Sequence, residues 1–192
     1  PYGQDAERDI SLRVVADHAR TAALCIADGV FPEKGGREYV LRRIMRRAIR
    51  HGKRLGFEEP FLHRVCARVV ERLGGAYPEL RERAQVIETI VLAEEQSFRR
   101  TLNRGLQKLQ EAIRTAGAAG QTTLTERFVG DLYATDGFPV DLTRTIAEES
   151  GLAVDEAAAM AWVARTHGAT DTRVGDEAVA SVYKELQERP GA

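Results

Sequence analysis

Residues 37–54 read REYVLRRIMRRAIRHGKR, and at 100° per residue this stretch divides into an apolar side and a cationic side. The apolar side collects Val40, Leu41, Ile44, Met45, Ala48 and Ile49. The cationic side collects Arg42, Arg43, Arg46, Arg47, Arg50, Lys53 and Arg54. A helix that only needed to be soluble would mix acids with these cations, so the pattern predicts a face that binds a polyanion. A solvated face neutralised by acids elsewhere in the fold is the alternative.

The charge of the chain is unevenly distributed along its 192 residues. The whole chain has a net charge of −1, which excludes a uniformly basic protein. Residues 31–56 nevertheless carry nine Lys and Arg against two acids, and the rest of the chain carries 19 against 27. This asymmetry predicts a local basic patch on an otherwise acidic body. A hydrophobic content of 43% is enough for a packed core in one domain or a compact pair.

Cysteine usage and hydropathy suggest an intracellular protein. Cys25 and Cys66 lie in apolar runs and are too few for a disulfide framework, so we expect reduced, buried thiols and a cytoplasmic location. No apolar run approaches the ~18 residues that a membrane span needs. The chain starts at Pro1 and has no signal peptide, so we expect a piece of a longer polypeptide.

Helical periodicity extends along nearly the whole chain, and no strand pattern is present. The sequence therefore predicts an all-α fold with one long central helix, followed by a smaller helical C-terminal sub-domain. Asp9 or Ser11 is expected to cap the first helix, and Gly105 to permit close approach to the long one. The Gly-rich stretch 115–123 predicts a boundary between domains 1–116 and 117–192. The helices are expected at about 9–27, 37–54, 60–73, 78–116, 124–133, 140–150, 155–166 and 176–188.

The sequence contains no pattern that makes a catalytic or metal site. It has no Gly-rich phosphate loop and no nucleophile elbow, and its four histidines lack metal-ligand spacing. His18 follows Asp17 and could act as a base, but a hydrogen-bonded helix histidine is the more common situation. Glu94 is expected to be buried against an arginine rather than to be catalytic, and Trp162 to lie in the core.

Two bends accompany the basic helix, at residues 33–36 and 134–138. Such bends let the backbone and short side chains approach a groove while arginines bind the phosphates. No aromatic residues are interleaved with the cations, which favours contact with a duplex over contact with a single strand.

Four long motifs closely resemble alanyl-tRNA synthetases. They are DISLRVVADHARTAALCIADGVFP (residues 9–32), REYVLRRIMRRAIRHGKRLG (37–56), AYPELRER (76–83) and GFPVDLT (137–143). The resemblance covers roughly residues 9–156 and falls in the central helical domain that follows the class II catalytic domain. It implies that this part grips the acceptor stem of tRNA-Ala and helps to read its third base pair, a G·U wobble.

The resemblance also implies what lies elsewhere in the full enzyme, which joins alanine to its tRNA with ATP. The family's catalytic motifs, its editing domain with a zinc site and its oligomerising domain are expected outside these 192 residues. ATP, magnesium and zinc are therefore implied for the full-length enzyme, and no cofactor and no catalytic residue for the fragment, which we expect to be inactive alone. The implied partners are the tRNA-Ala acceptor stem and the rest of the synthetase chain, with neither DNA nor a membrane.

At both usual reading positions this chain departs from the family's pattern. The family's Asn aligns with Gly36 and its Asp with Ala134, while Asp136 stands two residues later. Asp136 could accept from the guanine 2-amino group in the wide minor groove of RNA, or it could only stabilise the turn before Pro139. The residues expected to contact RNA are Lys34, Gly36, Arg37, Arg42, Arg43, Arg46, Arg47, Arg50, Lys53, Arg54, Ala134 and Asp136.

Two other functions compete with RNA binding at this stage. The basic face could dock acidic protein partners, which competition by an acceptor-stem duplex would distinguish. A self-standing enzyme using Asp17, His18 and Glu94 has the least support, because nothing in their spacing builds a site.

Overall fold

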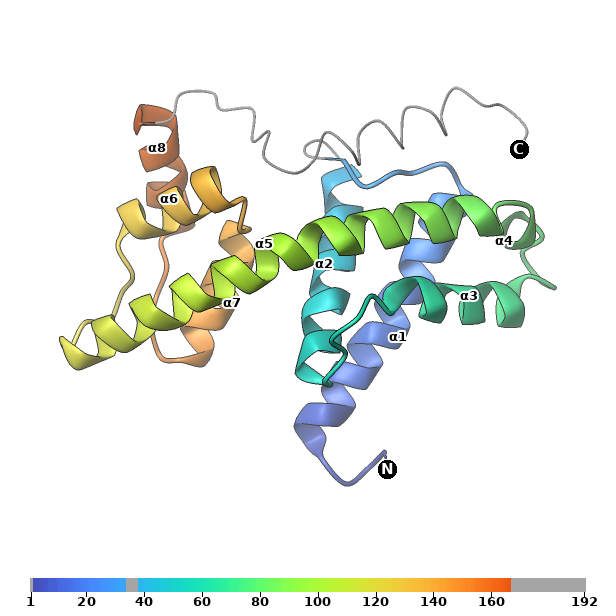
Figure 1. Ribbon diagram of the computed structural model, residues 1–192, viewed down its shortest axis with the longest axis horizontal. Helices are drawn as coiled ribbons and strands as arrows, with labels where there is room; N and C mark the ends of the chain where they lie inside the picture. Colours follow the sequence, from blue (N-terminus) through green and yellow to red (C-terminus); the bar gives the residue numbers. More distant parts are fainter. Residues whose placement is uncertain (1, 34–37, 167–192) are drawn as a thin grey trace. The chain divides into compact units, whose positions relative to one another are not determined.

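The computed structural model describes residues 2–33 and 38–166, and every regular element in these ranges is an α-helix (Figure 1). One isolated bridge between Thr123 and Ala153 is the only β-type pairing in the described ranges. The all-α prediction is confirmed. The helix expected over 176–188 lies outside the described residues. The helices are α1 (Ala6–Ala27), α2 (Glu38–Arg54), α3 (Leu62–Leu73), α4 (Glu79–Glu82), α5 (Ala84–Ala118), α6 (Glu126–Asp136), α7 (Val140–Glu149) and α8 (Glu156–Thr166).

The described residues form two compact units, 2–99 and 100–166, and α5 contributes to both. The sequence predicted a boundary after residue 116, where the Gly-rich stretch begins. In the structure α5 continues to Ala118, and its second half already packs into the second unit through Gly105. Linker composition indicates where a helix ends, whereas the division into units depends on where the packing partners change.

The first helix begins one turn earlier than predicted. Its N-cap is Asp5, whose carboxylate accepts a hydrogen bond from the backbone N–H of Arg8 at 3.0 Å. Asp9 and Ser11, the predicted caps, are buried side chains inside the helix. Asp9 instead accepts from the backbone N–H of Gly3 at 2.8 Å, so its carboxylate ties down the chain that precedes the helix.

Helices α1 and α2 pack against each other in the first unit. Ala19, Ala22 and Ala23 of α1 are fully buried, and these small side chains let the two backbones approach each other. From α2, Met45 and Ile49 are fully buried, so most of its predicted apolar side does face the core. The exceptions are Ile44, which is half-buried, and Val40, which is exposed.

The predicted helix over 78–116 is interrupted near its start. Arg83 has φ −107° and ψ 18°, outside the helical region, and it ends α4. Its carbonyl then accepts from the N–H of Ile87 at 2.9 Å, which starts α5. The prediction of one continuous helix is therefore wrong at this point, because helical periodicity persists across a break of a single residue.

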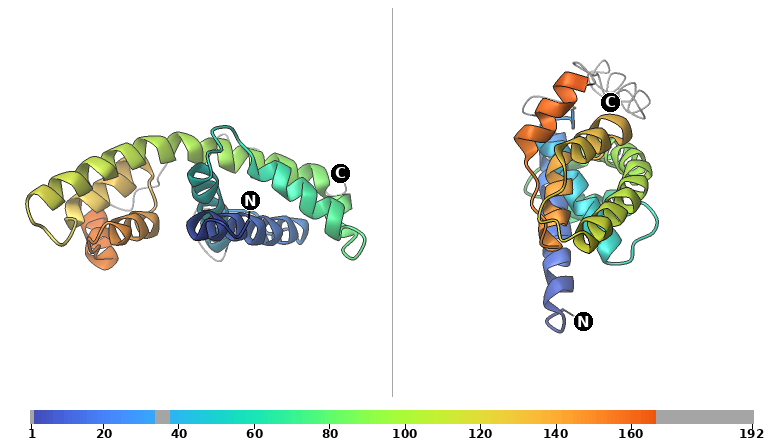
Figure 2. Two further views of the ribbon diagram at one scale, coloured as in Figure 1. Left: turned by 90° about the horizontal axis from the view of Figure 1, so that it is seen from below. Right: turned by 90° about the vertical axis from the view of Figure 1, so that its left-hand side faces the viewer.

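In the second unit, α6 and α7 lie beside the second half of α5, and α8 packs against α6 (Figures 1 and 2). A Cβ on Gly105 would lie 2.0 Å from the ring of Phe138, so the predicted close approach is confirmed. Gly137 ends α6 at φ 68°, a conformation that favours glycine. Trp162 was expected in the core, but it is half-buried and lies against α6.

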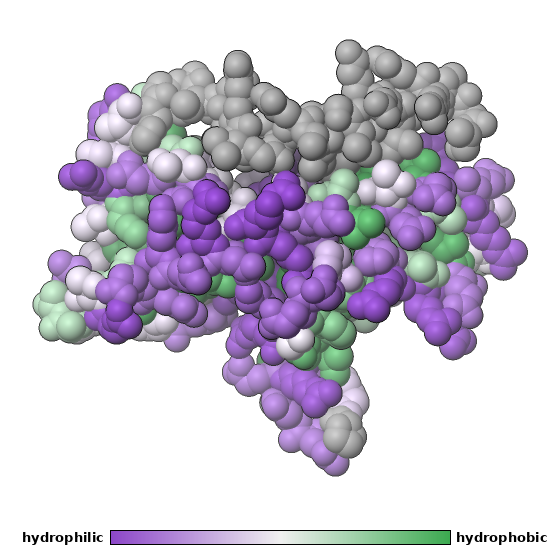
Figure 3. Space-filling model, viewed as in Figure 1, coloured by the Kyte–Doolittle hydropathy of each residue, from purple (hydrophilic) through white to green (hydrophobic). Residues whose placement is uncertain are grey.

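No described helix has the combination of length and hydropathy needed to cross a membrane. On the face drawn in Figure 3, hydrophilic side chains predominate and hydrophobic ones form small separate patches. The large exposed hydrophobic residues are accordingly scattered along the described chain, as Val40, Tyr77 and Met160 illustrate.

Candidate nucleic-acid interface

The cations of α2 do not share one exposed face. Arg43, Arg47 and Arg54 are exposed, and we call them the outward stripe. Arg42 and Arg50 are buried, and Arg46 and Lys53 are half-buried. The seven cations that the sequence places on one side of the helix therefore differ in exposure. An arc that is more than 100° wide has an inner edge, and residues at that edge lie against neighbouring elements once the helix packs.

A buried carboxylate of α5 holds the inner cations of α2. The Nε atoms of Arg42 and Arg46 donate to the same oxygen of Glu94, Oε1, at 3.0 and 2.8 Å. Glu94 is fully buried, and the guanidinium of Arg46 also lies 4.7 Å from the centre of the Phe98 ring. The prediction that Glu94 is buried against an arginine is confirmed. The pairing connects α2 to α5 and limits how α2 can rotate about its axis.

The seam between α1 and α2 contains a buried histidine next to the arginines. His51 is hydrogen-bonded through Nδ1 to the hydroxyl of Ser11 at 3.0 Å. Burial, and then the charges of Arg50, Arg54 and Arg47, lower the pKa of His51 to about 4. The imidazole is therefore neutral at neutral pH, and it adds no charge to the basic helix.

His18 lies on the same seam and behaves as a hydrogen-bonded helix histidine. Its Nδ1 is 3.4 Å from a carboxylate oxygen of Asp17. Burial is the main cause that lowers the pKa of His18, and the charge of Arg47 lowers it further. No other acid is bonded to it among the described residues, and Glu94 lies on α5 in its pairing with arginines. The geometry does not assemble the three-residue catalytic site considered above.

The outward stripe is the part of α2 that is available to a polyanion. Arg54 donates to Glu7 at 2.8 Å, so part of its charge is neutralised at the surface. Arg47 has no hydrogen bond or ion pair in the described part of the chain, and it lies one turn from Arg43. Three of the residues expected to contact RNA, Lys34, Gly36 and Arg37, lie outside the described residues.

The second expected reading position lies at the end of α6, in the second unit. The predicted bend at 134–138 is mostly helix, because α6 continues through Asp136 before Gly137 ends it. Ala134 is half-buried on that helix. Both carboxylate oxygens of Asp136 accept from the Nζ of Lys108, at 2.9 and 2.7 Å, and its side chain is 6% exposed. The sequence had no signal for Lys108, because its partner is 28 residues away along the chain.

Within the described residues, the histidine, cysteine and acidic side chains form no metal site, and the two cysteines form no disulfide. No group of three or more His, Cys, Asp and Glu side chains could hold a metal ion within the described ranges. Cys25 and Cys66 are both free thiols, and Cys66 is buried as expected, whereas Cys25 is only half-buried. Cys66 is buried, and burial raises its pKa to about 12, which makes it a poor nucleophile.

Comparison with known proteins places this helical chain in a family. The profile of a protein family described as tRNA synthetases class II (A) matches residues 1–191. The chain belongs to this family. This match confirms the predicted resemblance at the level of the family. The names of the individual relatives agree with the resemblance to alanyl-tRNA synthetases in particular.

Its relatives among the class II (A) synthetases include proteins named alanine–tRNA ligase. The protein from Sorangium cellulosum is 54% identical over 156 residues, which are 81% of this chain and 17% of the relative. The protein from Anaeromyxobacter sp. is 44% identical over 99% of this chain and 23% of the relative. A third, from Thermoanaerobacter sp., is 49% identical over 81% of this chain and 18% of the relative. The chain thus spans about a fifth of the length of the relatives it matches.

Proposed function

We propose that this chain is the part of an alanine–tRNA ligase that binds the acceptor stem of tRNA-Ala. The full-length enzyme, in this proposal, attaches alanine to that tRNA with ATP. The names of the relatives support the enzyme. The observation that supports the RNA contact is the exposed pair Arg43 and Arg47, one helical turn apart on α2.

The geometry of α2 divides its cations by role. Glu94 and Phe98 hold Arg46, and Glu94 also holds Arg42, so these side chains orient α2 rather than meet a ligand. Arg43 and Arg47 are exposed on α2, where phosphates can reach them. Such contacts set the register and the orientation of a protein on a duplex but do not read its sequence. Specificity has to come from other residues.

We assign the reading of the third base pair to the end of α6. A carboxylate has about four lone-pair sites, so Asp136 can bond Lys108 and still accept from a guanine amino group. Such a contact discriminates between base pairs by about 1–3 kcal/mol. In the full-length enzyme, Asp136→Asn keeps an acceptor oxygen without the charge, and Asp136→Ala removes both. If both variants retain the wild-type preference for G·U over G·C, Asp136 only stabilises the helix end.

The decisive experiment for RNA binding is competition on the 192-residue chain. A labelled acceptor-stem duplex of tRNA-Ala should be displaced by the unlabelled duplex at a lower concentration than by an unrelated duplex of equal length. Poly-glutamate is the control for a surface that binds acidic proteins. Equal displacement by both duplexes, or stronger displacement by poly-glutamate, would contradict the proposed function.

A further inference from the structure

The half-buried indole of Trp162 on α8 is fixed directly on the backbone of α6. Its Nε1 donates to a carboxylate oxygen of Asp131 at 3.0 Å. A Cβ on Gly130 would lie 2.7 Å from Cδ1 of the indole, so only a glycine admits the ring at that distance. The hydrogen bond and the backbone contact both engage the pyrrole edge of the indole, where Cδ1 and Nε1 are adjacent atoms, and together they hold the ring in one orientation.

Two guanidiniums lie close to this ring, one from each helix. The Cζ atoms of Arg127 and Arg165 are 6.0 and 5.9 Å from the centre of the Trp162 ring. The side chain of Arg127 is 75% exposed, and Asp131, its acidic neighbour, is 3.7 Å away. Arg165 is exposed and has no ion pair in the described part of the chain. Two guanidiniums and the carboxylate of Asp131 thus lie around this ring.

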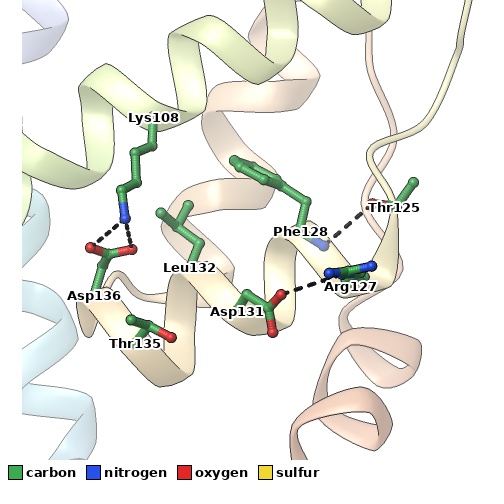
Figure 4. Close-up of a pocket in the computed structure, with 8 residues that line it drawn as sticks. All are labelled: Lys108, Thr125, Arg127, Phe128, Asp131, Leu132, Thr135 and Asp136. Carbon is green, nitrogen blue, oxygen red and sulfur yellow. Dashed lines mark hydrogen bonds and ion pairs between the residues drawn. The ribbon is translucent and has the colours of Figure 1, made fainter. Parts of the chain in front are cut away.

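Arg127 and Asp131 also line a cavity of about 310 Å³ beside α6 (Figure 4). The Lys108–Asp136 ion pair borders the cavity at one end, and Arg127 with Asp131 borders it at the other. Its wall between them is apolar and includes the ring of Phe128. A cavity of this size lies near the lower limit for small-molecule sites.

We propose that this surface of α6 and α8 binds an unpaired stretch of RNA. Arg127 and Arg165 bind its backbone phosphates beside Trp162, and the cavity receives one base. The proposal rests on the proposed function in taking RNA as the polyanion. Arginine and aromatic side chains together are typical of sites for unpaired nucleotides, because a splayed base needs an apolar surface and its phosphate a cation. The outward stripe of α2 offers cations without aromatic rings and therefore suits a duplex.

The chain provides its own probe, because Trp162 is its single tryptophan. The 192-residue chain is titrated with a single-stranded oligoribonucleotide and, separately, with a blunt duplex of the same length. We expect saturable quenching of the tryptophan fluorescence by the single strand and little change with the duplex. Affinity is measured in parallel by the anisotropy of a labelled RNA.

Arginine variants test whether the quenching comes from the proposed contacts. Arg127→Ala and Arg165→Ala should each weaken binding of the single strand by about three- to tenfold and leave duplex binding unchanged. Arg114→Ala is the matched control, because Arg114 has the same 75% exposure in the same unit but pairs with Glu111. It should change neither affinity. Far-ultraviolet circular dichroism of each exposed-site variant checks that the helices are intact.

The outcomes separate this inference from the proposed function. If the single strand neither quenches Trp162 nor binds more weakly to Arg127→Ala, the inference is overturned, while duplex binding through Arg47 stands. If the single strand binds as expected but acceptor-stem duplexes show no preference, the proposed function fails and this site remains. Quenching by poly-glutamate as strong as that by RNA would overturn the inference in favour of an acidic protein partner.

Discussion

Two glycines in α5 have opposite surroundings, although both lie in the same helix. The ring of Phe138 occupies the space where a side chain at Gly105 would be, with Cδ2 at 2.0 Å from an added Cβ. Nothing lies within 4 Å of an added Cβ at Gly117. A helical glycine is therefore required at the first position by packing and is only tolerated at the second.

We predict that alanine has opposite effects at these two positions. Gly105→Ala should destabilise the second unit by about 1–3 kcal/mol, because the aromatic ring has to move away. Gly117→Ala should stabilise it by up to about 1 kcal/mol through helix propensity. Urea unfolding followed by circular dichroism measures both. A neutral or stabilising Gly105→Ala would show that the packing around Phe138 adapts without loss.

Glu94 is the second residue whose role depends on its surroundings. Glu94→Gln or Glu94→Ala should lower the free energy of unfolding by about 3–5 kcal/mol, because two guanidiniums at low exposure lose their counter-ion. Glu88→Gln is the control, since Glu88 is exposed on the same helix. Chemical denaturation compares the two variants, and equal stability would mean that water compensates for the lost carboxylate.

At the scale of the element, α2 serves two purposes with neighbouring arginines. Its inner cations bind Glu94, and its outward stripe stays at the surface. The same amino-acid type, one position apart along the chain, therefore contributes either to folding or to charge at the surface.

We predict that Arg46→Ala and Arg47→Ala separate these purposes. Arg47→Ala should reduce the slope of log K against log salt for duplex RNA by about 0.7–0.9 and leave unfolding unchanged. Arg46→Ala should instead destabilise the fold, because it removes the contacts with Glu94 and Phe98. Salt titrations and urea unfolding on both variants give the comparison. The same slope for Arg47→Ala and the wild type would contradict a phosphate contact at this residue.

The α1–α2 seam predicts a dependence of stability on pH. The fold lowers the pKa of His51 from 6.5 to about 4, so the folded state favours the neutral imidazole. Its contribution to stability is complete above about pH 6.5 and is lost progressively as the pH falls from 6.5 to 4. His51→Asn can still bond Ser11 but does not titrate, so its urea midpoint should fall less over this range. If the urea midpoints of the wild type and of His51→Asn fell equally between pH 6.5 and 4, groups other than His51 would cause the acid sensitivity.

At the scale of the whole molecule, the described residues form two compact units. The family match covers residues 1–191, and the relatives are about five times longer. We therefore predict that the 192-residue chain alone makes no alanyl-adenylate. Alanine-dependent exchange of pyrophosphate into ATP should stay at background, with a full-length alanine–tRNA ligase as the positive control. Exchange above background would place the catalytic residues within this chain.

Several features of this protein followed from the order of its residues alone. The helical class, the amphipathic stretch of α2 and the pairing of Glu94 with arginine were predicted correctly, and so was the close approach at Gly105. The family resemblance also followed from local motifs. Periodicity and motifs depend on residues that are close in sequence, so they can be recognised before any packing is known.

Other features required the packed structure. Residues 42–54 do not indicate which arginines turn inward, because that depends on where α5 lies against α2. The pairs Lys108–Asp136 and Asp131–Trp162 join residues about 30 positions apart, and no local pattern indicates them. Helical periodicity indicates the direction in which a side chain leaves the axis of its helix. Whether that side chain is buried or paired with a charge depends on which other element lies in that direction.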